Sequence, residues 1–218
     1  MPEVIIQGLA GRIEARYQHS KIAGAPVALV CHPHPQHGGT MNNKVTYAMY
    51  QTFVKLGFST LRFNYRGVGE SQGEWGEGEG ELADASSALD FLQAHNTSAR
   101  GLWITGFSFG AWVAMQLLMR RPETDRFVVV APPANMYLFD FLAPCPCSGL
   151  ILQGDEDKVV PKPKVDDMVS KIRLQRGITI DYRTVSGADH FFATQMDVLT
   201  QNIEGYVRAA FQETKKAA

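Results

Sequence analysis

The sequence has few cysteines, almost no net charge and no long apolar run. Its three cysteines are an odd and small number for a disulfide framework, and Cys145-Pro146-Cys147 has no second cysteine pair to complete a zinc site. With 21 basic and 22 acidic residues, the formal net charge of −1 gives no field that would attract nucleic acid or an anionic membrane. No segment approaches the roughly 18 apolar residues of a membrane span. We therefore expect neither a nucleic-acid partner nor a membrane partner.

The remaining composition is that of an ordinary compact chain. Its 218 residues are 45% hydrophobic and 20% charged. At about 100–200 residues per domain, we expect a single domain over residues 1–218. The first residues lack the basic segment and apolar core of a signal peptide, so we expect a cytoplasmic location. Nothing in the composition predicts the oligomeric state.

Short apolar runs alternate with helical patterns along most of the chain. The run at 26–31 is continuously apolar, as in a buried strand of a parallel sheet. Further candidate strands, with apolar, β-branched or aromatic residues, lie at 58–63, 102–105, 127–131, 150–153 and 178–182. Apolar residues three and four apart predict helices over 45–53, 82–92, 113–118 and 196–211. This alternation predicts an α/β fold, with a mostly parallel twisted sheet and helices on both faces. Residues 4–7 and 12–17 predict a short antiparallel hairpin at its edge.

One stretch has a biased composition. Residues 67–81 contain six glycines and five glutamates. We interpret them as a solvated loop that leads into a helix whose acidic first turn suits the helix dipole.

Residues 106–110 read Gly-Phe-Ser-Phe-Gly and fit the pattern G-x-S-x-G. The pattern is common by chance, but here an apolar strand (102–105) precedes it and a helical run (111–118) follows it. A strand, a sharp turn and a helix in this order form a nucleophile elbow. The alternative is a serine that only caps a helix. The context favours Ser108 as a nucleophile.

A serine nucleophile needs a base, and a third group must orient that base. On such a scaffold the chain order is Ser, then Asp or Glu, then His. Five of the six histidines precede Ser108: His19, His32, His34, His37 and His95. Only His190 follows it, in a segment between the last expected strand and the last expected helix. His190 is therefore the predicted base.

The acid is expected in the loop 154–161, which follows the fifth parallel strand and contains three carboxylates. Asp157 fits best because it heads the turn and can point back along the sheet edge. Asp155 and Glu156 remain alternatives, since aspartates commonly bond the backbone of such turns. Asp189 is adjacent to the base and points the wrong way to orient its ring.

These motifs resemble the α/β-hydrolases, and among them the small cap-less dienelactone-hydrolase-like and serine-esterase-like members. The elbow matches, as do G-x-x-D-x-x-V-P at 154–161 and G-x-D-H at 187–190. Residues 64–71 resemble the superfamily's D-x-R-G-x-G-x-S segment, with Asn64 in place of the usual Asp. Dienelactone hydrolases use a cysteine nucleophile, so Ser108 favours an ordinary ester as substrate. The resemblance implies a serine hydrolase without a cofactor.

An oxyanion hole needs two backbone N–H donors. Phe109 is one candidate because it directly follows the nucleophile. The second donor should come from the loop 32–39, where prolines are excluded because they lack an N–H. By analogy with the family's H-G-x segment we expect His34, with Gln36 as the fallback.

The same loop contains three histidines, His32, His34 and His37, that raise the possibility of a zinc site. Zinc needs three or four ligands held by defined elements, and further groups that hydrogen-bond to these ligands and orient them. No Asp or Glu interrupts this run. We therefore predict no metal.

Residues 132–148 are too few to form a cap domain, so we expect an open and shallow site. Phe107, Met136, Tyr137 and Phe191 are the expected substrate-binding residues, and Arg66 is the candidate handle for an anionic group. The leading hypothesis is hydrolysis of short-chain carboxylic esters. The alternatives are a thioesterase, a peptidase-like amidase that cleaves after proline, and a non-catalytic binding module.

Overall fold

The computed structural model describes residues 3–217, and the side chains of residues 3–212. In this part of the chain eight strands form one sheet in the order β1-β2-β4-β3-β5-β6-β7-β8. The strands are β1 (Glu3–Gly8), β2 (Gly11–Gln18), β3 (Val27–Cys31), β4 (Ser59–Phe63), β5 (Leu102–Phe107), β6 (Arg126–Val130), β7 (Ser148–Gly154) and β8 (Ile180–Val185). The hairpin β1–β2 is antiparallel and β2 pairs antiparallel with β4, whereas β4, β3 and β5–β8 are parallel to one another. The predicted fold class is confirmed.

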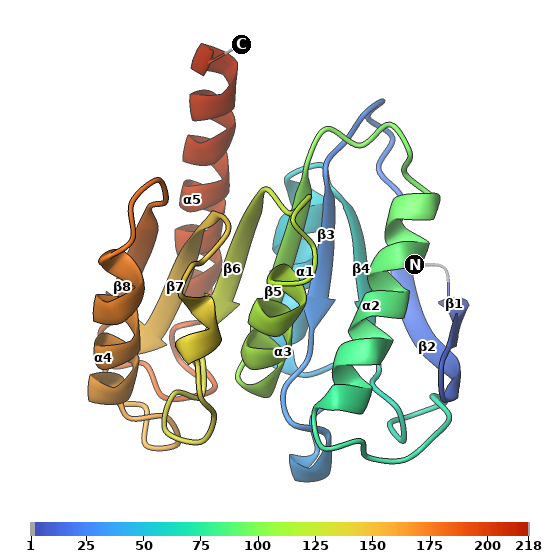
Figure 1. Cartoon of the computed structure of the whole chain (residues 1–218), viewed down its shortest axis with the longest axis horizontal. Coiled ribbons are helices and arrows are strands. Elements are labelled where there is room, and N and C mark those ends of the chain that lie inside the picture. Colours follow the sequence, from blue (N-terminus) through green and yellow to red (C-terminus); the bar gives the residue numbers. More distant parts are fainter. Residues whose placement is uncertain (1–2, 218) are drawn as a thin grey trace.

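Helices cover both faces of this sheet (Figure 1). They are α1 (Lys44–Lys55), α2 (Glu79–Ala94), α3 (Phe109–Leu118), α4 (Lys162–Arg173) and α5 (Met196–Ala217). α1 and α5 lie behind the sheet in Figure 1, and α2, α3 and α4 lie in front of it. Among these five described helices, none combines the length and the apolarity needed to cross a membrane.

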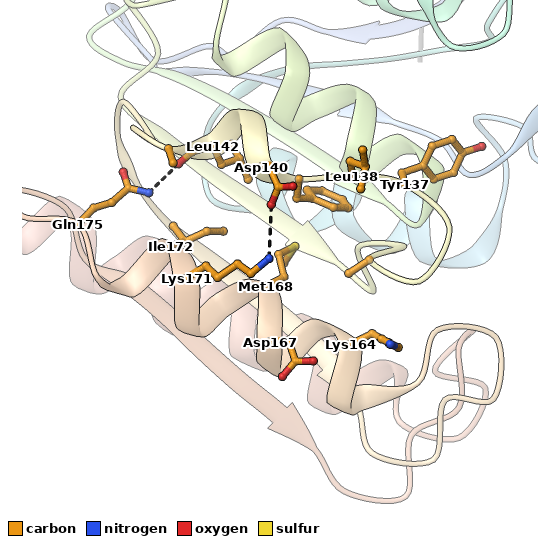
Figure 2. Close-up of a pocket in the computed structure, with 13 residues that line it drawn as sticks. Tyr137, Leu138, Asp140, Leu142, Lys164, Asp167, Met168, Lys171, Ile172 and Gln175 are labelled. Carbon is orange, nitrogen blue, oxygen red and sulfur yellow. Dashed lines mark hydrogen bonds and ion pairs between the residues drawn. The ribbon is translucent and has the colours of Figure 1, made fainter.

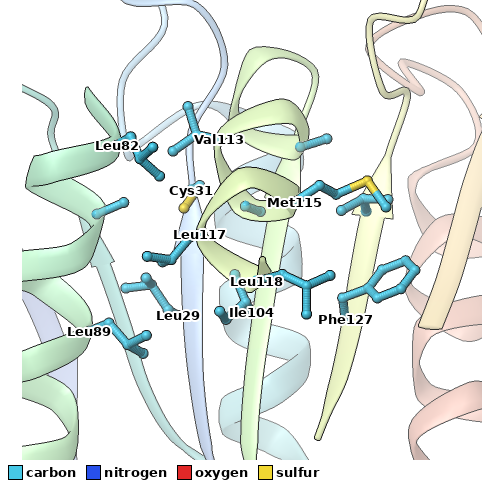
Figure 3. Packing of buried hydrophobic residues seen from close by; sticks show 14 of the residues in the cluster. Leu29, Cys31, Leu82, Leu89, Ile104, Val113, Met115, Leu117, Leu118 and Phe127 are labelled. Atoms are coloured by element: carbon cyan, nitrogen blue, oxygen red, sulfur yellow. The ribbon is translucent and has the colours of Figure 1, made fainter. Parts of the chain in front are cut away.

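Each layer of helices buries its own hydrophobic core against the sheet. The central strands β3, β4 and β5 are buried along their whole length. The apolar or small residues of β3 and β5 predict this, whereas β4 also buries Arg62. On the front face, side chains from α2 (Leu82 and Leu89), α3 (Leu117) and β3 (Leu29) gather between the helices and the sheet (Figure 3). The three cysteines are free and buried.

Helix α4 is absent from the sequence prediction. Its buried residues Val165, Met168, Val169 and Ile172 are spaced as on one face of a helix, so the signal was present. A highly polar opposite face and Pro163 near its start obscured it, although proline is well tolerated in the first turn of a helix.

The segment between β6 and β7 contains only one short 3-10 turn, Asp140–Leu142, and no cap domain. The loops that follow β3, β5, β7 and β8 meet at one edge of the sheet, because parallel strands end at the same edge. These four loops contain the candidate oxyanion residue, nucleophile, acid and base.

Candidate active site

Ser108 lies at the sharp turn between β5 and α3. Its backbone is left-handed, with φ 53° and ψ −122°, a conformation that is strained for a residue with a side chain. The flanking glycines make the turn possible. A Cβ at Gly106 would lie 2.1 Å from the carbonyl oxygen of Gly110, and a Cβ at Gly110 would lie 2.4 Å from that of Cys31. The half-buried serine is thereby presented at the carboxyl edge of the sheet.

The structure brings the predicted base and acid to this serine. His190 Nε2 lies 3.0 Å from Ser108 Oγ, and His190 Nδ1 lies 2.7 Å from Asp157 Oδ2. A carboxylate can only accept, so Nδ1–H donates to Asp157 and Nε2 is left to accept from the serine hydroxyl. This is the tautomer that a general base requires.

Asp157 is buried and fully hydrogen-bonded. Its Oδ1 accepts from the backbone N–H groups of Val159 (2.9 Å) and Val160 (2.7 Å), and its Oδ2 also accepts from Gln153 Nε2 (3.1 Å). These bonds fix the carboxylate against the imidazole. Of the two alternatives, Asp155 accepts from the Gly187 N–H at 2.7 Å and thus ties two loops together, and Glu156 is exposed.

The two residues that carry the candidate oxyanion donors contact each other. The rings of His34 and Phe109 are 4.9 Å apart, and the hydrogen bonds of the described residues engage neither of their backbone N–H groups. The N–H of Gln36 donates instead to His34 Nδ1 at 3.2 Å, so the fallback donor is already engaged. This arrangement favours His34 over Gln36.

His32, the first residue of the loop 32–39, is buried and has a structural role. Its Nδ1–H donates to the Pro33 carbonyl at 2.7 Å, and its Nε2 accepts from the Tyr65 N–H at 3.0 Å. Burial lowers the pKa of His32 to about 3, so the ring stays neutral. Burial also lowers the pKa of His34, with a smaller contribution from nearby His37. Because both ring nitrogens of His32 are engaged, it is unavailable to a metal.

The glycine-rich segment 67–81 packs against the loop 32–39, which contains the candidate oxyanion residue His34; we call residues 32–39 the oxyanion loop. Trp75 packs against both His34 (4.7 Å between ring centroids) and Phe109 (5.5 Å). Glu81 is fully buried and accepts from the N–H groups of Gly76 (3.0 Å) and Gly78 (2.7 Å). The interpretation of this segment as a solvated loop is therefore wrong at these positions. The one sequence signal that this segment packs against the protein was Trp75, a large apolar residue among glycines.

A cavity of about 270 Å³ opens above Ser108. Of the predicted substrate-binding residues, Met136, Tyr137 and Phe191 line it. Phe107 does not, because it is the last residue of β5 and its fully buried ring packs under His190, 5.1 Å away. Sequence reasoning missed several further lining residues: Pro33, Gly38, Gly39, Asn43, Pro133 and Val159.

A separate cavity of about 370 Å³ lies between residues 134–143 and α4 (Figure 2). Tyr137 lines both cavities, and its ring points away from the other labelled residues in Figure 2. That ring stacks on Trp112 at 4.5 Å. Tyr137 is therefore the residue that the linings of the two cavities share.

Arg66 does not reach either cavity. Its guanidinium makes a bidentate ion pair with the buried Asp84, at 3.0 Å and 2.8 Å. This pair raises the pKa of Arg66 and holds the start of the 64–71 segment against α2. The expectation that Arg66 could serve as a handle for an anionic substrate is wrong.

Comparisons with known proteins agree with this architecture. Residues 20–157 match the family model described as X-Pro dipeptidyl-peptidase (S15 family). The chain is 52% identical to protein ATU1826 of Agrobacterium tumefaciens, with a TM-score of 0.95 and 97% of each chain covered. It is 33% identical to an α/β serine hydrolase homologue from Coxiella burnetii (TM-score 0.83; 94% of this chain, 96% of that one). It is 28% identical to XC6422 of Xanthomonas campestris, an α/β serine hydrolase without a lid (TM-score 0.85; 95% and 94%).

Proposed function

The chain belongs to the X-Pro dipeptidyl-peptidase (S15) family and is an α/β serine hydrolase without a lid, and from this premise we propose that it hydrolyses short-chain carboxylic esters. The observation that carries the proposal is the continuous hydrogen-bonded chain from Ser108 through His190 to Asp157. It stands at an elbow that only glycine neighbours permit.

In the proposed reaction, Ser108 Oγ attacks the ester carbonyl while His190 Nε2 takes its proton. The backbone N–H groups of His34 and Phe109 stabilise the oxyanion. His190 then returns the proton to the departing alcohol, which leaves an acyl-enzyme on Ser108. A water molecule, deprotonated by His190, hydrolyses this acyl-enzyme and restores the serine. Asp157 holds the imidazole and stabilises its charged form throughout.

The cavity lining supports an uncharged ester over a dipeptide. Among the lining residues, all of which lie in the described chain, none is acidic and none is Lys or Arg. A dipeptidyl substrate carries an α-ammonium group, and burying a charge without a partner is costly. The walls formed by Met136, Tyr137, Val159 and Phe191 suit an apolar group instead.

The test is hydrolysis of p-nitrophenyl acetate, propionate and butyrate by the wild type and by Ser108→Ala. Removal of the serine in another Ser-His-Asp hydrolase lowers kcat about 10⁶-fold, so near-complete loss is expected. Equal rates in both proteins would refute the role of Ser108. Parallel assays with an acyl thioester and with an X-Pro amide distinguish the alternative bonds. Absence of both turnover and fluorophosphonate labelling of Ser108 would favour a binding module.

We also propose a cytoplasmic location. The three cysteines are free and buried, which suits a reducing compartment. Cell fractionation tests this directly.

A further inference from the structure

We propose that the leaving alcohol binds in a groove between the first turns of α1 and α5, and that the preferred ester joins a small acyl group to a larger apolar alcohol. This groove has a volume of about 560 Å³, twice that of the cavity above Ser108. The inference rests on the proposed esterase function and assigns the two sides of its substrate.

The groove adjoins the cavity above Ser108. Asn43 and Phe191 line both spaces. Beyond them, Tyr47 from α1 and Ala193 and Met196 at the start of α5 line the groove. A substrate bound at Ser108 therefore reaches this groove by extending past Phe191.

The chemistry of the reaction assigns this side to the alcohol. The departing oxygen must take its proton from His190 Nε2, so the leaving group lies on the His190 side of the tetrahedral carbon. Phe191 follows His190 in the chain, and their rings are 5.1 Å apart. The groove that opens beyond Phe191 is thus the one nearest to the departing oxygen.

We assign the acyl group to the side of Met136 and Tyr137, since both residues line the cavity above Ser108 and neither lines the groove. The Tyr137 ring is held in place by its stack on Trp112, whose Nε1–H donates to the Leu138 carbonyl at 3.3 Å. An acyl chain that points away from His190 meets this aromatic wall. An alcohol that points toward His190 enters the larger groove.

The surface of the groove suits an apolar alcohol. Phe191 is 52% exposed and Tyr47 is 39% exposed, which are large values for aromatic side chains that share one groove. Tyr47 is held in position, since its hydroxyl accepts from Gln51 Nε2 at 2.8 Å and the Arg62 guanidinium lies 5.0 Å from its ring centre. Lys44 is the one charged residue of this lining within the described chain.

Two isomeric esters provide the test. Octyl acetate and ethyl octanoate have the same formula and similar hydrophobicity, but they place the long chain on opposite sides of the carbonyl. Below their solubility limits, we expect kcat/KM for octyl acetate to exceed that for ethyl octanoate at least tenfold. Equal values, or a preference for ethyl octanoate, would overturn the proposal while leaving the esterase function intact. If neither of these esters nor ethyl acetate is hydrolysed, the proposed function itself fails, and this inference fails with it.

Variants in the groove localise the effect. Ala193 is exposed, so Ala193→Trp is expected to fill the groove and to lower the ratio of octyl acetate to ethyl acetate turnover at least fivefold. Tyr47→Ala should lower the same ratio by removing one wall. Leu174→Ala, at an 85% exposed position after α4, is the control and should keep the wild-type ratio. Because each ratio is measured within one protein preparation, partial misfolding cancels. An unchanged ratio in both groove variants would overturn the assignment.

Discussion

The rings of His34 and Phe109 lie 4.9 Å apart, so the two residues that present the candidate oxyanion donors contact each other through their side chains. Trp75 packs against both rings and closes a three-ring cluster. The relative position of the two backbone N–H groups is therefore set by side-chain packing as well as by the backbone of each loop. Residues that never touch the substrate can thus influence the oxyanion hole.

Trp75→Ala should lower kcat roughly tenfold to a hundredfold with a small change in KM. Loss of one oxyanion donor costs about 10²–10³ in rate, and displacement of a donor costs part of that. The distinguishing readout is affinity for a boronic acid, which forms a tetrahedral adduct with the serine and should weaken in parallel with kcat. Unaltered boronate affinity in a folded variant would show that Trp75 does not position the hole.

Glu81→Gln should produce a weaker form of the same defect. Each carboxylate oxygen of Glu81 accepts one backbone N–H, and an amide keeps only one of these two acceptors. Glu79→Gln in the same helical turn is the matched control, because Glu79 is exposed. We expect a several-fold fall in kcat for the first variant and none for the second. Similar kcat values for the two variants would contradict the role of Glu81.

Asp157→Asn should nearly abolish turnover, whereas Asp155→Asn should change it only a few-fold. The equivalent change in another Ser-His-Asp enzyme lowers kcat about 10⁴-fold because the imidazole takes the wrong tautomer. Among the hydrogen bonds of the described residues, the Asp155 side chain accepts from the Gly187 N–H, and the side-chain oxygen of asparagine preserves that bond. Initial rates with p-nitrophenyl acetate, at pH values where each protein is folded, compare the two variants. A larger loss in Asp155→Asn would reverse the assignment of the acid.

The local parts of this site could be predicted from the sequence, and the parts created by tertiary contact could not. The elbow is contiguous, so its glycines and its strand and helix neighbours are visible in one window. The burial of Phe107 beneath His190 depends on how β5 meets the loop after β8 that contains His190. Nothing in the pattern G-x-S-x-G distinguishes Phe107 from Phe109. The contact between Trp75 and the oxyanion loop joins segments about forty residues apart.

The structure explains why Asn64 replaces the usual Asp of the D-x-R-G-x-G-x-S segment. Its Nδ2 donates to Glu14 Oε2 at 2.8 Å, and its Oδ1 accepts from the Met41 N–H at 2.8 Å. An aspartate at this position would place two carboxylates together in a buried network. Glu14 lies on β2, so the sequence around Asn64 alone gives no sign of the partner that requires an amide.

Tyr137→Ala should lengthen the acyl chain that the enzyme accepts. The substitution removes the side chain that lines both the 270 Å³ and the 370 Å³ cavities, so the space above Ser108 should grow toward the second cavity. We expect the optimum in a series of p-nitrophenyl esters to move from acetate or butyrate toward hexanoate or octanoate. Tyr137→Phe keeps the ring and should keep the wild-type optimum. If both variants share one profile, the ring does not set the acyl limit.

Acidification should destabilise the protein through His32. Its pKa is about 3 in the folded chain, against about 6.5 in an unfolded one. Between these values the unfolded state binds the additional proton, so this contribution is fully present above about pH 6.5 and declines as the pH falls toward 3. The expected slope approaches about 1.4 kcal/mol per pH unit in the free energy of unfolding.

Urea unfolding at pH 7 and pH 5 measures this effect. His32→Gln should be less stable at pH 7, because its hydrogen bonds to Pro33 and Tyr65 are disrupted, and should lose less stability on acidification. His95→Gln replaces an exposed imidazole and is the control for the loss of a histidine side chain as such. A wild-type slope in His32→Gln would mean that another group governs the acid sensitivity.

Two helical glycines should respond in opposite ways to the same substitution. In a helix, alanine is favoured over glycine by about 1 kcal/mol. At Gly205 in α5 a new Cβ meets only the Arg183 side chain at 3.9 Å, so Gly205→Ala should raise the free energy of unfolding by about 0.5–1 kcal/mol.

At Gly110 in α3 the new Cβ would lie 2.4 Å from the Cys31 oxygen and 2.5 Å from the His32 oxygen, both backbone atoms that cannot rotate away. Gly110→Ala should therefore destabilise the protein by a few kcal/mol. It should also lower esterase activity in the molecules that remain folded, because α3 must withdraw from β3 and carry the Phe109 N–H with it. Stabilisation by both substitutions would show that the close approach of α3 to β3 is not required for the elbow.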